Sequence, residues 1–108
     1  MEHRVRNLLM IGGSRVAFYL GRRCLDIGMS VTIIEWDHAR CLELAEAMPK
    51  ATIIEADGSR QDVLEGEGFQ NFDAVITLTG IDEENLVLSM LASHVGVPKV
   101  ITKINRLE

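Results

Sequence analysis

The sequence is poor in cysteine, proline and aromatic residues, and it contains no long apolar run. Of its 108 residues, two are cysteine, two are proline and 5% are aromatic. Cys24 and Cys41 fall on expected helix faces beside apolar residues, which indicates reduced thiols in a core rather than a disulfide framework. No apolar stretch approaches the roughly 20 residues that span a bilayer, and the N-terminus lacks the apolar segment of a secretory signal. We therefore expect a cytoplasmic protein without direct membrane insertion.

Positive charge is also scarce. The formal net charge of −5 at pH 7 argues against binding of nucleic acid or of an anionic membrane as the main role. A solvated terminus and a solvated helix face account for the basic residues that do cluster, which are Arg4, Arg6, Arg22 and Arg23. No metal site is expected, because metal-ligand spacing is lacking among the histidines, which are His3, His38 and His94.

Apolar residues, at 47%, are sufficient for one domain over residues 1–108 to bury a core. Their pattern predicts strands at 7–12, 30–35, 51–55, 74–79 and 99–104. It predicts helices at 14–27, from Asp37 to Pro49, at 60–66 and at 82–95. The first helix is expected to bury Val16, Leu20, Cys24 and Ile27. The final Leu107-Glu108 is interpreted as a cloning-site remnant, and the chain as a fragment of a longer protein.

The predicted strands are short and mostly apolar on both faces, which is typical of a parallel sheet covered by helices on both sides. Right-handed crossovers then favour a Rossmann-like, doubly wound α/β fold with strand order 3-2-1-4-5. Ligands of such sheets bind at the carboxyl ends of the strands. The sequence places polar residues there, namely Gly12, Gly13, Ser14, Glu35, Asp57, Thr79 and Asn105.

The segment from residue 8 to residue 35 has the order of a nucleotide-binding unit. An apolar run at 8–11 leads into Gly12-Gly13-Ser14-Arg15-Val16-Ala17, and a second run at 31–34 stops at Glu35. The pattern G-x-G-x-x-G/A falls on Gly12, Ser14 and Ala17, so a serine replaces the middle glycine. Glycines let the backbone approach a phosphate, and the helix N-terminus offers it free N–H groups. The Ser14 hydroxyl is expected to donate to the phosphate or to cap the helix.

Each remaining candidate has a functional and a structural interpretation. Glu35 is expected to bind ribose hydroxyls and to repel a 2′-phosphate, which favours NAD over NADP; the alternative is a solvated carboxylate. Arg15 either spans a diphosphate or lies on a helix surface. Trp36 either covers an adenine or is an exposed indole. Asp57-Gly58 either forms a wall of the adenine pocket or a turn in which Ser59 caps the next helix.

Catalytic machinery is not evident, since no Ser/His/Asp or Cys/His set converges on the strand ends. Asp82, Glu83 and Glu84 are explained by the dipole of the helix that they begin. Two alternatives remain. A phosphoacceptor receiver domain would use Asp57, Thr79 and Lys103, but it needs acids where Gly12-Gly13 stands. The cofactor-binding fragment of an NAD-dependent oxidoreductase would need a nicotinamide half-site, for which the chain has little room.

Several stretches resemble the regulatory N-terminal nucleotide-binding module (RCK or KTN, TrkA-N) of potassium transport proteins, and within it the cytosolic regulatory subunit of Trk potassium uptake. They are Ile11 to Ala17, Val31 to Glu35 with Asp37 and Arg40-Cys41, Glu55 to Ser59, Leu78 to Asn85, and Lys99 to Ile101 with Asn105-Arg106. The family's glycine turn usually reads Gly-Gly-Gly-Arg, from which Ser14 departs. The chain also ends before the sixth strand, crossover helix and C-terminal subdomain typical of the family.

The resemblance implies a non-enzymatic sensor that binds NAD(H) or ATP/ADP and gates a membrane potassium channel by ligand-dependent rearrangement. Such modules are cytoplasmic, peripheral to the membrane through their transporter, and assemble as dimers within a ring. We expect the phosphates or a nicotinamide to reach toward Thr79, Asn105 or a neighbouring subunit. The dimer surface is expected at the last strand or helix, with apolar residues Leu86, Met90 and Val97.

Overall fold

A computed structural model describes residues 4–106 of the chain. The expectations for His3 and for Leu107-Glu108 concern residues outside this range. The elements are β1 (Asn7–Ile11), α1 (Arg15–Asp26), β2 (Ser30–Glu35), α2 (His38–Ala47), β3 (Thr52–Glu55), α3 (Gln61–Gly66), the short 3-10 helix η1 (Phe69–Asn71), β4 (Ala74–Thr77), α4 (Asp82–His94) and β5 (Lys99–Thr102). All strand pairs are parallel, and the sheet order β3-β2-β1-β4-β5 confirms the predicted topology.

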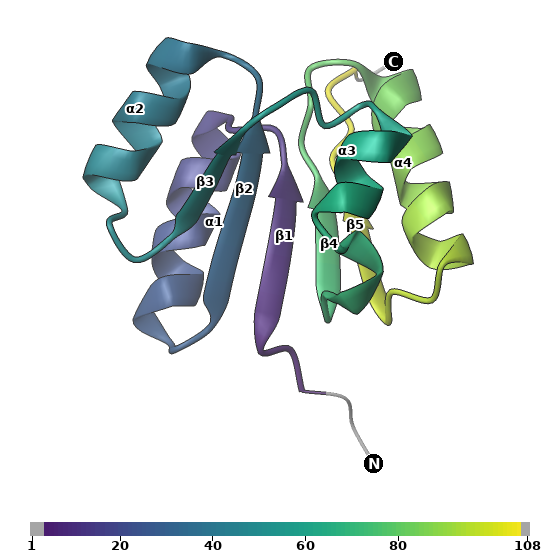
Figure 1. Ribbon diagram of the computed structural model, residues 1–108, viewed down its shortest axis with the longest axis horizontal. Helices are drawn as coiled ribbons and strands as arrows, with labels where there is room; N and C mark the ends of the chain where they lie inside the picture. The colour runs from purple at the N-terminus through teal and green to yellow at the C-terminus, as the bar shows by residue number, and fades with distance from the viewer. Residues whose placement is uncertain (1–3, 107–108) are drawn as a thin grey trace.

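Helices cover both faces of the sheet, with α1 and α2 on one side and α3 and α4 on the other (Figure 1). Side chains of β1 alternate between the two sides. Leu8 and Met10 pack in the core beneath α1 and α2, whereas Leu9 and Ile11 pack in the core beneath α3 and α4. The central strand is therefore buried on both faces, which explains its continuous apolar sequence.

The buried face of α1 differs from the prediction. Ala17, Gly21 and Cys24 are buried, whereas Val16 and Ile27 are 42% and 75% exposed. Small residues face the sheet because α1 follows β1 after a tight turn and packs close to it. A Cβ atom on Gly21 would lie 3.8 Å from a methyl carbon of Ile33 in β2 and 3.1 Å from the sulfur of Met48, which follows α2.

Two strands are also shorter than predicted. β4 ends at Thr77 rather than Thr79, and β5 ends at Thr102 rather than Ile104. Thr77 and Thr102 are the last paired residues of the ladder. Beyond them the chain turns away because the backbones of Thr79 and Lys103 hydrogen-bond to the side chain of Asn85 in α4.

The apolar residues proposed for a dimer surface separate into two groups. Leu86 and Met90 on α4 are 58% and 64% exposed. Val97 is 5% exposed and packs in the core, so its assignment to a surface is wrong. The chain folds back after α4, where the Val97 amide donates to the Ala92 carbonyl at 3.1 Å. Within residues 4–106 no helix has the length and apolar character needed to cross a membrane.

Candidate functional site

A cleft of about 820 Å³ opens at the carboxyl ends of the strands, where the topology places ligands. This volume lies within the range of about 300–1,000 Å³ that is common for small-molecule sites. Nine of the residues predicted to bind a cofactor line this cleft, namely Gly12, Gly13, Ser14, Arg15, Glu35, Trp36, Asp57, Gly58 and Thr79. Val16 and Asn105 do not line it. The prediction did not include Ile11, Ile34, Asp37, Arg40, Ser59, Leu78, Gly80, Ile81 and Glu84, which complete its lining.

The two glycines of the turn after β1 are required by close packing. Gly12 has φ +109°, and a Cβ atom there would lie 2.7 Å from the carbonyl oxygen of Leu78. A Cβ atom on Gly13 would lie 2.6 Å from a methyl carbon of Leu44. The turn is therefore packed between α2 and the segment that follows β4, and both glycines line the cleft.

Ser14 is the N-cap of α1, as the sequence suggested. Its hydroxyl accepts a hydrogen bond from the Ala17 amide at 3.3 Å. Among residues 4–106 no acceptor is found for the amides of Ser14, Arg15 and Val16. The positive end of the α1 dipole lies at these free donors, an arrangement that favours an anion at the cleft.

Glu35 extends from the end of β2 over the glycine turn. One carboxylate oxygen accepts from the Gly13 amide at 2.7 Å, and the other accepts from the Asp37 amide at 2.8 Å. These bonds hold the carboxylate in the wall of the cleft. Each oxygen can accept a second hydrogen bond, so ribose hydroxyls remain possible partners.

Arg40 is a residue of the site that sequence reasoning did not select. Its side chain is 25% exposed, and its Nε donates to the Gly13 carbonyl at 2.6 Å. Its Nη2 donates to the Ser14 carbonyl at 3.2 Å, and its Nη1 donates to Glu43, also at 3.2 Å. The available signal was its position three residues after Asp37, which caps α2 through the Arg40 amide at 2.9 Å. That spacing places Arg40 in the first turn of α2.

The loop after β3 forms another part of the cleft wall through Asp57, Gly58 and Ser59. The Asp57 carboxylate accepts from the Ser59 hydroxyl at 2.6 Å and from the Ser59 amide at 3.0 Å, and these bonds lower the pKa of Asp57. The N-cap of α3 is Arg60 without a side-chain bond, so the interpretation of Ser59 as the cap is wrong. Gly58 is buried, and a Cβ there would lie 2.6 Å from a methyl carbon of Ile11. Trp36 lies at the cleft with 74% of its surface exposed.

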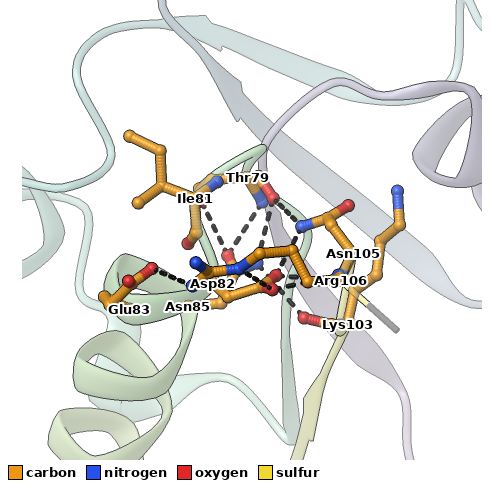
Figure 2. A network of polar contacts seen from close by, with 8 residues as sticks. All are labelled: Thr79, Ile81, Asp82, Glu83, Asn85, Lys103, Asn105 and Arg106. Atoms are coloured by element: carbon orange, nitrogen blue, oxygen red, sulfur yellow. Dashed lines mark hydrogen bonds and ion pairs between the residues drawn. The ribbon is translucent and has the colours of Figure 1, made fainter. Parts of the chain in front are cut away.

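Thr79 lines the far side of the cleft, where Asn85 fixes it (Figure 2). The Thr79 amide and hydroxyl donate to Asn85 Oδ1 at 2.9 and 2.8 Å. Asn85 Nδ2 donates to the carbonyls of Thr79 and Lys103 at 2.9 and 3.2 Å. The side-chain amide of Asn85 is fully buried, and its polar atoms have hydrogen-bond partners. Through these bonds it links α4 to the cleft wall and to the segment after β5.

Asn105 belongs to a neighbouring network rather than to the cleft lining (Figure 2). Its amide and its side-chain nitrogen each donate to Asp82 Oδ1 at 2.8 Å, and Arg106 donates to Asp82 Oδ2. These hydrogen bonds lower the pKa of Asp82 from 3.8 to about 2. Asp82 and Glu83 therefore hold the segment after β5 in addition to complementing the helix dipole. The sequence analysis had explained these two acidic residues by the helix dipole alone and did not predict this contact.

Glu84 lies on the cleft side of α4, and burial, with a smaller contribution from the charge of Asp57, raises its pKa. Lys103 is not part of the cleft lining, and its amide donates to the Thr77 carbonyl at 3.0 Å. The structure therefore does not bring Lys103 into the cleft with Asp57 and Thr79, which a phosphoacceptor site would require.

The sheet order, the glycine turn before α1 and the carboxylate at the end of β2 define a Rossmann-like domain. Residues 8–108 match the model of the TrkA-N domain, and the chain belongs to this family. The Trk system potassium uptake protein TrkA homolog 2 of Methanosarcina mazei is 38% identical over 105 residues, which cover 96% of this chain. The match covers 23% of that relative, so the chain spans about a quarter of its length.

Solved structures share the fold at lower identity. The Kef C-terminal domain of Shewanella denitrificans in its AMP-bound form has a TM-score of 0.71 at 15% identity, covering 90% of this chain and 57% of that one. A short-chain dehydrogenase/reductase of Veillonella parvula in complex with NADP has a TM-score of 0.67 at 14% identity. It covers 92% of this chain and 47% of that one. Both likenesses concern the fold alone.

Proposed function

We propose that this chain is the nucleotide-sensing domain of a potassium uptake system, and that it binds NAD(H) or ATP/ADP without acting as an enzyme. One observation carries the proposal: the unpartnered amides at the start of α1 and the Glu35 carboxylate line the same cleft. Membership of the TrkA-N family and relatives named as Trk potassium uptake proteins support the role in potassium transport. The partner is then a membrane potassium transporter, and the domain is a cytoplasmic, peripheral component.

The chemistry of the cleft walls suggests how the nucleotide is arranged. Its phosphates take the free amides of Ser14 and Arg15, with the Arg15 guanidinium above them. Its ribose hydroxyls donate to Glu35. Its adenine lies between the part of the cleft wall that holds Trp36 and the loop that holds Asp57. A 2′-phosphate would meet the charge of Glu35. Arg40, the nearby cation, is already bonded to Gly13, Ser14 and Glu43, which supports binding of NAD over NADP.

The composition of the cleft supports a role without catalysis. Within residues 4–106, its lining contains no histidine, cysteine, lysine or tyrosine. Of the four carboxylates in this lining, Glu35, Asp37 and Asp57 are held by hydrogen bonds within the domain. Binding would act by favouring one arrangement of an assembly over another, and its effect is limited by the difference in affinity between the two.

The assembly that responds would be a homodimer or a ring built through α4. Leu86, Val87 and Met90 on this helix are 58%, 62% and 64% exposed, so a second copy can bury them. Thr79 and Ile81 connect the same helix to the cleft, which gives a nucleotide a direct contact with the segment that precedes the interface.

Titration of the 108-residue chain with NAD, NADH, ATP, ADP and NADP, followed by calorimetry, tests the proposal. We expect at least one ligand with an unphosphorylated 2′-hydroxyl to bind at millimolar concentration or below, and NADP to bind more weakly than NAD. Absence of binding by all five nucleotides would overturn nucleotide sensing. Preference for NADP would contradict the role of Glu35 in ribose selection.

A further inference from the structure

We propose that Arg40 is a positioning residue that orients the glycine turn toward the phosphate without contacting the phosphate itself. This inference rests on the proposed nucleotide binding. Arg40 lies on α2, whereas the phosphate site lies at the start of α1. Its role is to fix backbone groups of a neighbouring element.

The contacts of Arg40 with the turn use one edge of its guanidinium. Nε donates to the Gly13 carbonyl at 2.6 Å, and Nη2 donates to the Ser14 carbonyl at 3.2 Å. The planar guanidinium presents these two donors at a fixed spacing, which a flexible ammonium does not reproduce. Two successive peptide groups of the turn are thereby held by one side chain.

Peptide planarity converts these bonds into an orientation of the amides. The backbone of residues 4–106 has no cis peptide bond, so a carbonyl and the following N–H point in opposite directions. When Arg40 holds the Gly13 carbonyl, the Ser14 amide points away from α2. The Ser14 carbonyl is held both by Arg40 at 3.2 Å and by the Phe18 amide of α1 at 3.0 Å, so the Arg15 amide also points away from α2. These are two of the amides that lack a partner within residues 4–106.

The surroundings of Arg40 restrain its side chain. Nη1 donates to Glu43 at 3.2 Å, and the guanidinium carbon lies 5.9 Å from the centre of the Phe18 ring. Only 25% of the side chain is exposed, so the bonds to the turn are partly shielded from water. The nitrogens of the Arg40 guanidinium therefore already donate to the turn and to Glu43. This arrangement suits a role in orienting the turn rather than in binding a ligand.

The positioning role predicts a loss that depends on the phosphate. Without Arg40, the Gly13 carbonyl can rotate toward the cleft, where its negative end would repel an anion, whereas the Ser14 carbonyl stays bonded to the Phe18 amide at 3.0 Å. Adenosine carries no phosphate, so its binding should not depend on this orientation. Arg40→Met removes the hydrogen bonds but keeps a side chain of similar length.

Arg22→Met is the matched control variant. Arg22 also lies over the Phe18 ring, at 5.7 Å, but no hydrogen bond joins it to the turn among the described contacts. Both variants remove one positive charge, so their comparison separates the hydrogen bonds of Arg40 from the general attraction of the domain for an anion.

The experiment is a titration of the wild type and both variants with ADP and with adenosine, monitored by amide chemical shifts in ¹⁵N-labelled chains. We expect ADP to bind Arg40→Met roughly tenfold more weakly than Arg22→Met, since hydrogen bonds to a charged group are lost. Adenosine should bind both variants as it binds the wild type. Arg40→Lys should recover only part of the ADP affinity.

Two results would overturn the positioning role while leaving nucleotide binding intact. One is equal ADP affinity of Arg40→Met and Arg22→Met. The other is an equal loss of ADP and adenosine affinity in Arg40→Met, which would mean that Arg40 supports the whole cleft. A wild-type chain that binds none of adenosine, ADP, ATP, NAD and NADH would instead contradict the proposed function itself.

Discussion

Glu35 is a single residue with two tasks, because its carboxylate closes the glycine turn and also faces the cleft. It accepts from the Gly13 amide at 2.7 Å and from the Asp37 amide at 2.8 Å. The sequence predicted only its position at a strand end and its role toward a ribose. Its bond to Gly13 was not predictable, because it depends on the distance between two loops that belong to different strands.

Replacement of this residue gives a direct test of the ribose contact. Glu35→Ala should weaken ADP or NAD binding about five- to tenfold, because ribose hydroxyls lose an ionised acceptor. Calorimetry measures the change, and a circular dichroism melt verifies that the variant is folded.

Glu55→Ala is the matched control for this measurement. Glu55 ends β3 and is the register partner of Glu35, yet it does not line the cleft. It should therefore leave nucleotide affinity close to that of the wild type. Equal affinities of the two variants would remove Glu35 from the ribose site.

Among the helices and strands, α4 shows most clearly which features of an element can be predicted from sequence and which cannot. Its bounds, Asp82–His94, were predicted to within one residue, because acids mark its start and a glycine follows its end. Its inner face was not predicted, since it combines the polar residues Asn85 and Ser89 with the apolar residues Leu88 and Ala92. Asn85 is buried because it satisfies the backbone of two loops, and such a tertiary role leaves no periodic signal.

The start of α4 also predicts a dependence of stability on pH. The pKa of Asp82 is lowered from 3.8 to about 2 in the folded chain. A carboxyl with a lowered folded pKa stabilises the protein fully above its unfolded pKa, and this contribution disappears as the pH falls through the folded value. Urea denaturation from pH 5 to pH 2 should therefore show a free energy of unfolding that declines as Asp82 is protonated.

Asp82→Asn provides the comparison for this pH series. The asparagine cannot be ionised, so the difference in stability between wild type and variant should be largest near pH 5 and shrink toward pH 2. A difference that stays constant over this range would show that the hydrogen bonds from Asn105 and Arg106 do not depend on the carboxylate charge.

At the scale of the whole molecule, the fold was predictable and the detailed lining of the cleft was only partly so. Strand order follows from an alternation of strands and helices with right-handed crossovers, and these are local signals combined with one general rule. The glycine turn, Glu35, Asp57 and Thr79 follow strand ends and were predicted in the same way, whereas the apolar residues Ile11, Ile34 and Leu78 were not. Arg40 and Glu84 were missed because helices contribute them, and a helix position becomes part of a cleft only through packing.

The exposed face of α4 predicts self-association of the chain. Met90→Asp should shift the chain toward monomer, because a charge would replace an apolar side chain that is 64% exposed and available to a second copy. Light scattering after size exclusion, over a range of protein concentrations, measures this shift. Leu42→Asp on α2, at a residue that is 58% exposed, is the control and should leave the mass unchanged. A wild type that is monomeric at every concentration would refute self-association through this face.

The double hold on Gly13, by Glu35 through its amide and by Arg40 through its carbonyl, has a consequence for protein engineering. The glycine turn does not hold its conformation through its own residues alone. If residues 7–17 were grafted into another sheet without residues 35–43, the transplanted loop would lack both of its restraints. A chimera that still binds an anion would have to contain both strand–helix units, β1 with α1 and β2 with α2.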